Sequence, residues 1–232
     1  ALGKAMRQVV QGSAKSFQLR YIDWEGAERD GRGRNVFHVT EEYKVARTGR
    51  DDHFTPDLVL FVNGIPLAVI ECKKADPSPG GAPGVKQGVT QHIRNQKPDG
   101  IPRLFRTAQV LGAISPGGWP GGGEAERAAP AKYATVGTKE AHWAAWREQA
   151  IGEEEIGRII NTPLGERERD RLLEGRPTRV REDFERAERE GRLVTDQDRL
   201  LVGVFSPGRL LTLTRRYTLF DQGEKKIARH QQ

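Results

Sequence analysis

Apolar and polar residues alternate over two stretches near the start of the chain. Residues 16–24 (SFQLRYIDW) and residues 35–46 (NVFHVTEEYKVA) show this pattern, which is typical of strands with one buried face. Residues 26–34, which lie between them, are rich in glycine and charge and predict a loop. The pattern therefore predicts that the chain begins with β-structure.

Two nearly continuous apolar runs come next, residues 58–62 and 65–70, joined by Asn63-Gly64. Asn-Gly between two β-rich runs is the strongest short-range signal of a hairpin. Strands that are apolar at almost every position are buried on both faces, as in the centre of an α/β sheet. The sequence therefore predicts a buried hairpin at the centre of the fold.

The pattern after the hairpin changes from strand to helix and back. A Pro/Gly-rich loop (DPSPGGAPG) precedes a predicted helix over residues 85–96, and IPRLF at residues 101–105 leads into a buried strand, AQVLGAIS. We therefore predict an α/β fold with a central mixed sheet flanked by helices.

A second Gly/Pro-rich stretch, residues 116–130, separates this part from the rest of the chain. Residues 132–137 predict the last strand. Residues 139–149 predict a helix that carries Trp143 and Trp146 at helical spacing, and we interpret the two tryptophans as core residues.

Charge dominates residues 153–198, which predict helices with solvated faces. Apolar residues return in residues 206–220 and predict helical packing on the core. We therefore divide the chain into a core over residues 1–150 and a charged helical extension over residues 151–232.

Charged residues gather at one end of the predicted hairpin. Successive side chains on a strand point to opposite faces, so Glu71 and Lys73 share a face that Cys72 does not. Asp57 begins the partner arm at the same end. A regular two-residue turn would place Asp57 and Glu71 on opposite faces of the sheet, whereas a three-residue loop or one bulge would pair Asp57 with Val69 and make Glu71 its diagonal neighbour. We therefore predict an odd-length loop or a bulge.

Two carboxylates beside a lysine suit the hydrolysis of a phosphodiester. Asp57 and Glu71 are predicted to bind Mg²⁺, a hard cation that prefers oxygen ligands, with the backbone carbonyl of Cys72 as a further ligand. Lys73 would orient or deprotonate the attacking water and stabilise developing negative charge. The residues leave open whether one or two ions act. The competing interpretation is a strand-capping aspartate and a surface ion pair.

The order Pro-Asp, apolar strand, turn, apolar strand and Glu-x-Lys resembles the PD-(D/E)xK nuclease motif. The surrounding sequence resembles the N-terminal part of the restriction (motor) subunit of type I restriction–modification enzymes. The segments that carry the resemblance are NVFHVTEEYKV, PDLVLFVNGIPLAVIECK, QHIRNQ, IPRLF and YATVGTKEAHWAAW. The last residues, RRYTLFDQGEKKIARHQQ, are similar to the segment that precedes the motor domains in this family. The resemblance implies that Asp57 and Glu71 are metal ligands, that Lys73 is the catalytic lysine, and that Mn²⁺ can substitute for Mg²⁺.

The resemblance also points to auxiliary residues. The family carries a Gln-x-x-x-Tyr motif on the helix after the hairpin; Gln91 fits its first position, but Asn95 stands in place of the tyrosine. Gln91 is therefore either a site residue or a helix-surface glutamine. Glu42, on the family's first β segment, could approach the ion or face solvent. Apart from the resemblance, five basic residues near the proposed site in sequence are either ordinary surface charges or, as a group, contacts to the DNA backbone: Lys44, Lys74, Arg94, Lys97 and Arg103.

Composition narrows the functional classes. Lys and Arg number 38 against 32 Asp and Glu, for a net charge of +6, which is compatible with a nucleic-acid partner but also with an ordinary basic surface. No run approaches a membrane span, and the beginning of the chain lacks the apolar run of a signal peptide. The single cysteine excludes an internal disulfide and favours a reducing, cytoplasmic setting.

Other catalytic patterns are missing from the sequence. The five histidines show no His-x-x-x-His spacing for zinc, and there is no Gly-x-Ser-x-Gly elbow. GGWPGGG lacks the Lys-Ser/Thr of a phosphate loop, so any ATP-driven motor is expected beyond Gln232.

We therefore expect a Mg²⁺-dependent endonuclease domain that cuts double-stranded DNA. The resemblance implies that cleavage follows ATP-driven translocation by motor domains and that modification and specificity subunits are the partners. Two alternatives remain at this point: a standalone DNA repair or junction nuclease of the same fold, and a non-catalytic DNA-binding or docking module.

Overall fold

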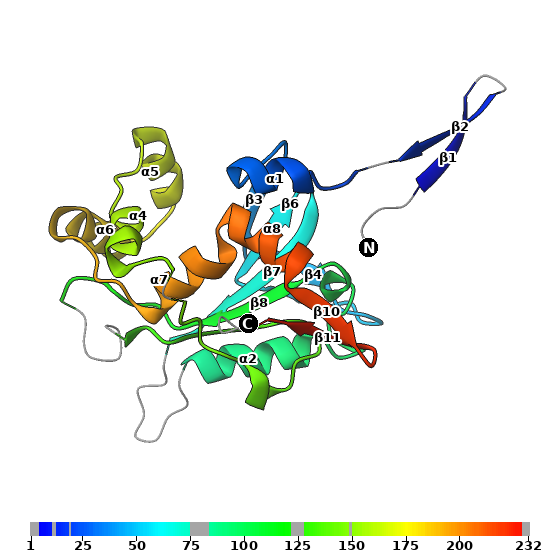
Figure 1. Ribbon diagram of the computed structural model, residues 1–232. Helices are drawn as coiled ribbons and strands as arrows, with labels where there is room; N and C mark the ends of the chain where they lie inside the picture. The colour runs from blue at the N-terminus through cyan, green and yellow to red at the C-terminus, as the bar shows by residue number, and fades with distance from the viewer. Residues whose placement is uncertain are drawn as a thin grey trace.

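A five-stranded mixed sheet lies between helices on both of its faces in the computed structural model of the chain (Figure 1). The structure describes residues 5–10, 13–18, 20–74, 84–121, 128–148 and 150–228. Most of the predicted Pro/Gly loop after Lys74 and the middle of the predicted loop 116–130 lie outside these residues. The predicted α/β class, with a central mixed sheet flanked by helices, is confirmed.

The sheet has the order β3-β6-β7-β8-β9, in which β7 is central. Neighbouring strands are antiparallel except β7 and β8, which are parallel. The strands are β3 (Phe37–Glu41), β6 (Leu58–Val62), β7 (Ile65–Cys72), β8 (Val110–Ile114) and β9 (Ala131–Ala134). β6 and β7 form the hairpin that the two apolar runs predict.

The turn of this hairpin has two residues. Asn63 and Gly64 both have positive φ angles, 51° and 78°, as a two-residue turn that matches the twist of the strands requires. The Asn63 side chain also accepts a hydrogen bond from the amide of Val36 and donates to the carbonyl oxygen of Tyr21, which fixes the turn to the segment before β3.

The predicted bulge is present and lies in β7. Phe61 pairs with Pro66 and Leu60 pairs with Ala68, so Leu67 is the additional residue. Pro66 has no amide hydrogen to donate to the ladder, and prolines within sheets are found at such irregular positions. The bulge thus adds a residue to β7, whereas the predicted diagonal register required one in β6 or in the turn.

This register sets the relative positions of the charged residues. Leu58 pairs with Ile70, so Asp57, one residue before, and Glu71, one residue after, lie directly across from each other. The expected pairing of Asp57 with Val69 is therefore wrong, because Val69 pairs with Val59. The two carboxylates nevertheless share one face of the sheet, as the hypothesis of a common site requires.

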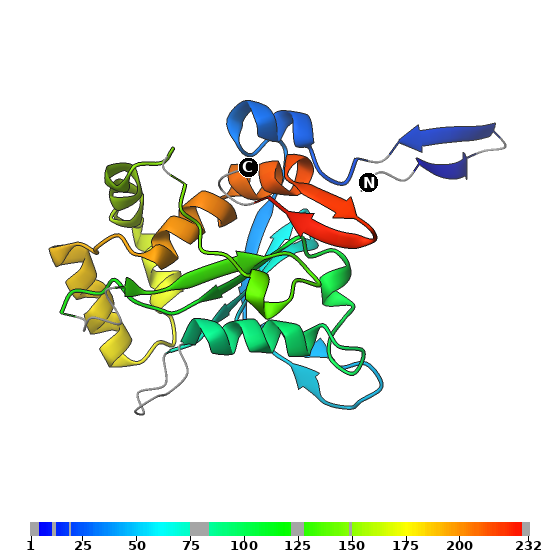
Figure 2. The same ribbon diagram turned by 60° about the horizontal axis from the view of Figure 1, so that its bottom comes forward.

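One face of the sheet is covered by α2 (Gly84–Asn95), which confirms the helix predicted over residues 85–96 (Figure 2). Valines on the strands and on the helix pack together there with aromatic residues of the following segment. We call this cluster the α2-side core; its buried members include Val59, Val69, Val89, Phe105, Leu111 and Trp143.

The opposite face is covered by α1 (Trp24–Asp30), by a π-helical turn η3 (Leu201–Phe205) and by α8 (Pro207–Arg216). The buried residues of this α8-side core include Ile22, Ile70, Tyr133, Leu200, Val204 and Leu211. Part of the predicted helical extension therefore packs directly on the sheet, as its apolar content predicts. The division of the chain at residue 150 stays a prediction.

The prediction of a strand over residues 16–24 and a loop over residues 26–34 is wrong in its second half. The strand ends at Gln18, and α1 begins at Trp24. Asp23 caps this helix by accepting a hydrogen bond from the amide of Gly26, and Gly31 ends it with a φ of 78°. Both are local signals of helix ends that the glycine-rich composition concealed.

The helix predicted over residues 139–149 is not formed by residues 139–148, the part of this range that the structure describes. They contain the short 3₁₀ turn η2 (Glu140–His142), after which Ala144 bridges to Tyr133. Trp143 belongs to the α2-side core and Trp146 to the α8-side core. One face of a helix could not place the two tryptophans on opposite sides of a sheet, although their interpretation as core residues is confirmed.

The remaining strands form two-stranded pairs: β1 (Ala5–Val10) with β2 (Ser13–Gln18), β4 (Val45–Ala46) with β5 (His53–Phe54), and β10 (Thr218–Asp221) with β11 (Glu224–Ile227). The prediction that residues 132–137 form the last strand is therefore wrong, because β10 and β11 come after β9. The other helices are α4 (Glu153–Ile160), α5 (Glu166–Leu173), α6 (Thr178–Glu190) and α7 (Asp196–Leu200), with a 3₁₀ turn η1 (Leu104–Arg106) before β8.

Among the described helices, none combines the length and the apolar composition that crossing a bilayer would require.

Candidate functional site

The charged end of the β6–β7 hairpin lies on the α2 side of the sheet. Val59 and Val69 belong to the α2-side core, and side chains two residues along a strand share a face. Asp57 and Glu71 therefore point towards α2, and Lys73 lies on the same side. Cys72 points to the other face, where it packs against the α8-side core.

Hydrogen bonds join the three charged side chains. The Lys73 ammonium donates to Asp57 Oδ2 at 2.6 Å and to Glu71 Oε2 at 3.4 Å. The backbone amide of Cys72 donates to the same Asp57 oxygen at 2.7 Å. The carboxylates of both arms thus converge on one ammonium group, as the sequence predicts.

Gln91 completes the cluster from α2. Its side-chain amide donates to Glu71 Oε2 at 2.6 Å, so the structure places it at the site and not on the free surface of the helix. Asn95, at the position of the family's tyrosine, is fully buried one turn further on. The first half of the Gln-x-x-x-Tyr pattern therefore reaches the candidate site.

Glu71 differs from Asp57 and Lys73 in its complete burial. Its side chain has no solvent exposure, and its Oε1 atom has no hydrogen-bond partner. Burial, and then the negative charge of Asp57, raises the pKa of Glu71 from 4.5 to about 8. A buried carboxyl group is costly to ionise without a compensating cation, so this position favours a bound positive charge.

Lys73 is held in its charged form. Burial alone would lower its pKa, but the hydrogen bond to Asp57 and the charge of Glu71 outweigh that effect, and the pKa is raised. The neighbouring Cys72 thiol is also protonated, since burial and then the charge of Asp57 raise its pKa to about 12. The cluster therefore offers one ammonium donor and no reactive thiolate.

A divalent cation fits this donor set. Two carboxylates face each other, and one of their oxygens is buried without a partner. Within the part of the chain that the structure describes, no three His, Cys, Asp or Glu side chains come close enough to share an ion. Mg²⁺ is commonly held by one or two carboxylates, with water and phosphate oxygens as its other ligands, so two suffice.

The other predicted ligand positions are less closely involved. Glu42 comes directly after β3, with an exposed side chain and a φ of 48°. Its backbone amide donates to the carbonyl oxygen of Asp57, but its carboxylate does not join Asp57 and Glu71 in a cluster. The expected place of Glu42 on a strand is wrong, and the roles of Glu42 and of the Cys72 carbonyl stay predictions.

The five predicted DNA-backbone residues are all exposed. Arg94 and Lys97 lie three residues apart at the end of α2, the helix that carries Gln91. The structure does not group the others with them: Lys44 precedes β4, Lys74 comes after β7, and Arg103 precedes η1.

Two glycines that sequence reasoning missed bring α2 close to the site. A methyl group added to Gly84 would lie 1.9 Å from the carbonyl oxygen of Lys73, and one added to Gly88 would lie 3.5 Å from Glu71 Cβ. Gly84, Gly88 and Gln91 recur at helical spacing on one face, which is the sequence signal that could have shown this contact.

Gly84→Ala is expected to move the start of α2 away from Lys73 and to lower the free energy of unfolding by about 1–3 kcal/mol, measured by urea denaturation. Gly152→Ala is the matched control, because nothing lies within 4 Å of its added methyl group; it should change stability by less than about 0.5 kcal/mol. Equal effects of the two substitutions would show that the close contact at Gly84 is not needed.

Comparison with known proteins places the site within a family. Residues 3–116 match the family described as the N terminus of the type I restriction enzyme R protein. This segment is similar to that family. Asp57, Glu71, Lys73 and Gln91 all lie within it. The sequence resemblance to the type I R protein is thereby confirmed.

A curated relative is similar to part of the chain. The putative type I restriction enzyme MjaIXP endonuclease subunit of Methanocaldococcus jannaschii is 33% identical over 101 residues. The alignment covers 43% of this chain and 9% of that relative, so the similarity concerns a small part of a much longer protein.

Proposed function

We propose that this chain carries the nuclease site of a type I restriction enzyme R protein, which hydrolyses phosphodiester bonds of double-stranded DNA with the help of Mg²⁺. The observation that carries the proposal is the convergence of Asp57, Glu71 and Lys73, with an oxygen of Glu71 buried and unpartnered. The order of these residues along the hairpin supports membership of the PD-(D/E)xK superfamily. The relative's name as an endonuclease subunit supports the activity.

Asp57 and Glu71 are the residues that would hold Mg²⁺ or, in its place, Mn²⁺, with the Cys72 carbonyl oxygen as a further ligand. The ion would supply a Lewis acid for a phosphoryl oxygen and lower the pKa of a water molecule. Gln91 fixes the orientation of the Glu71 carboxylate through its hydrogen bond. That hydrogen bond limits the positions that Glu71 can adopt in the site.

Lys73 acts in this proposal as a hydrogen-bond donor. Because its raised pKa keeps it an ammonium group, it suits the stabilisation of negative charge on a phosphate oxygen better than the removal of a proton from water. Of the two roles that the sequence leaves open, orientation by the charged amine is the one that this environment favours.

The wider context of the R protein is part of the same proposal. Cleavage would take place after ATP-driven translocation by motor domains, and the modification and specificity subunits would be the protein partners. The chain itself would cut without sequence preference and would work in the cytoplasm.

Calorimetric titration with Mn²⁺ tests the metal site directly. Asp57→Asn is expected to weaken binding more than about tenfold, because it removes a ligand of the ion. Asp51→Asn is the matched control, since Asp51 is an exposed carboxylate outside the cluster. Ion binding that is unchanged in the Asp57 variant would remove the metal site and the proposed reaction with it.

A further inference from the structure

The outer side of α2 carries positive charge close to the candidate site. Gln91 touches Glu71, and Arg94 and Lys97 come after it at intervals of three residues. Three residues correspond to about 4.5 Å along a helix axis, so Arg94 lies within about one turn of the residue that reaches the cluster.

The Arg94 guanidinium is held in place by its neighbours. Its centre lies 4.7 Å from the centroid of the Phe54 ring, and its Nε and Nη2 atoms both donate to the side-chain oxygen of Asn95 at 3.3 Å. Packing on an aromatic ring and a forked hydrogen bond restrict the rotamers of an arginine, which lowers the entropy lost when it binds an anion.

A second arginine packs on the same ring but differs from Arg94, because carboxylates neutralise its charge. Arg47 also packs on Phe54, at 4.4 Å, but its charge is met by Asp52 at 2.8 Å and by Asp99 at 3.5 Å. Among the described residues, no carboxylate lies within ion-pair distance of Arg94. An ordered guanidinium without a carboxylate partner suits a phosphate group.

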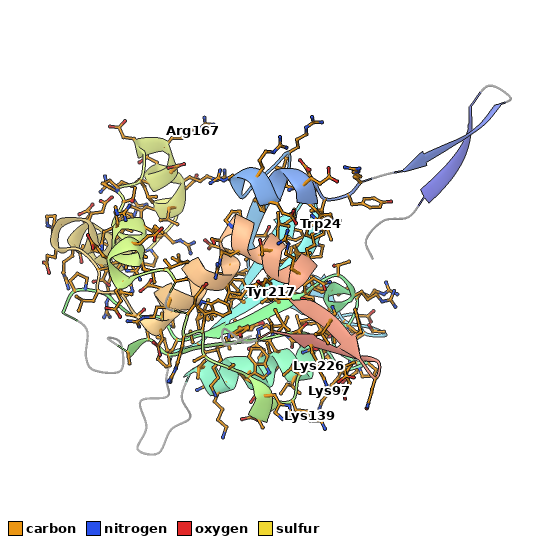
Figure 3. The ribbon with its side chains drawn as sticks, viewed as in Figure 1. Trp24, Lys97, Lys139, Arg167, Tyr217 and Lys226 are labelled. Atoms are coloured by element: carbon orange, nitrogen blue, oxygen red, sulfur yellow. The ribbon has the colours of Figure 1, made fainter. Side chains whose placement is uncertain are left out.

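Lys139 extends this charge beyond the end of α2. The Gln96 side chain accepts a hydrogen bond at 2.8 Å from the amide of Gly137, two residues before Lys139. Figure 3 shows Lys97 and Lys139 near each other at the same edge of the molecule, while Arg167 lies on α5 at the opposite edge. Neither lysine forms an ion pair within the described part of the chain.

We propose that Arg94, Lys97 and Lys139 form a phosphate-binding surface that holds the backbone of duplex DNA where it leaves the cluster of Asp57 and Glu71. The proposal rests on the proposed function for the identity of the substrate. It adds the surface, and with it the direction in which the DNA runs: along α2 from its Gln91 side towards η2.

The test is duplex binding without cleavage, measured by fluorescence anisotropy of a labelled duplex in EDTA at several salt concentrations. The triple variant Arg94→Ala, Lys97→Ala, Lys139→Ala is expected to reduce the slope of log affinity against log salt by about 2 to 3, since each phosphate contact contributes about 0.9. The matched control is Arg167→Ala, Arg171→Ala, Arg189→Ala on α5 and α6, which removes the same charge from another face and should leave the slope unchanged.

A second pair of variants separates position from charge. Arg94→Lys keeps the charge but loses the planar fork, and Phe54→Leu removes the ring beneath the guanidinium. Both are expected to weaken binding several-fold while the salt slope stays the same. Three outcomes would each overturn the proposal. The α2 and α5–α6 triple variants could lose equal affinity, the α2 triple variant could bind like the parent, or the parent could lack measurable affinity for DNA.

The nuclease function and the phosphate-binding surface can be refuted independently of each other. The Asp57→Asn protein should bind the duplex at least as tightly as the parent, because the substitution removes a negative charge beside the surface. A chain that binds DNA through Arg94 but binds no metal and never cuts would refute the nuclease function alone. A chain that cuts DNA yet binds it independently of these cations would refute the surface alone.

Discussion

Lys73→Ala is expected to lower the rate of DNA cleavage by the complete R protein about 10²–10³-fold or more, which is the cost of removing one donor that stabilises transition-state charge. Lys73 is the ammonium group that contacts both Asp57 and Glu71. Rates of ATP hydrolysis and translocation should stay unchanged, because those steps would belong to other domains. The measurement is single-turnover cleavage of circular DNA alongside ATPase activity.

Two controls make the result interpretable. Lys74→Ala removes the neighbouring exposed lysine and should have a small effect that depends on salt. Lys73→Arg keeps the positive charge between the carboxylates, so it should retain the parent's thermal stability while cleavage remains impaired. Cleavage by the Lys73→Ala protein at the parental rate would exclude Lys73 from the reaction.

Glu71→Gln is expected to stabilise the fold at alkaline pH while it abolishes metal-dependent cutting. The pKa of Glu71 is raised from 4.5 to about 8 in the folded protein, so the folded state keeps this proton at pH values where the unfolded chain has released it. The parent should therefore lose stability from about pH 4.5 upward, by up to about 1 kcal/mol per pH unit, until the loss is complete above about pH 8.

The glutamine side chain has the same shape and carries no charge at any pH, so the variant should lack this loss. Urea denaturation in EDTA at pH 5, 7 and 9 is expected to show the variant more stable than the parent at pH 9 by roughly 1–3 kcal/mol. Glu154→Gln, at an exposed position on α4, should behave like the parent. Mg²⁺ should restore stability to the parent and not to the variant. A Glu71 variant with the parent's pH profile would contradict the burial of a charged carboxylate.

Sequence reasoning succeeded where local chemistry is strong. The Asn63-Gly64 turn needs two positive φ angles, which few residue pairs tolerate, and the flanking apolar runs fix which strands are central. The helix after the hairpin was predicted within a residue of its bounds. The position of Asp57, Glu71 and Lys73 at one end of the hairpin follows from these elements, whereas the common face of Asp57 and Glu71 depends on the bulge at Leu67.

The predictions of secondary structure were wrong where tertiary contacts set the backbone conformation. Trp143 and Trp146 are spaced as in a helix, yet each is buried on a different side of the sheet from an irregular segment. The prediction of a loop at α1 was wrong, since short capped helices are concealed by glycine and charge. β10 and β11 were missed because their exposed residues show little of the burial that creates a readable period.

The sequence by itself determined the class of fold, the central hairpin and the three charged residues at its end, because each depends on contacts between residues close together in the chain. Only the tertiary structure decided the register. The bulge at Leu67 places Glu71 directly opposite Asp57, and the approach of α2 brings Gln91 to Glu71 and removes that carboxylate from water. A one-residue shift between strands exchanges the faces of all their side chains, and such a shift is set by the packing of the whole sheet.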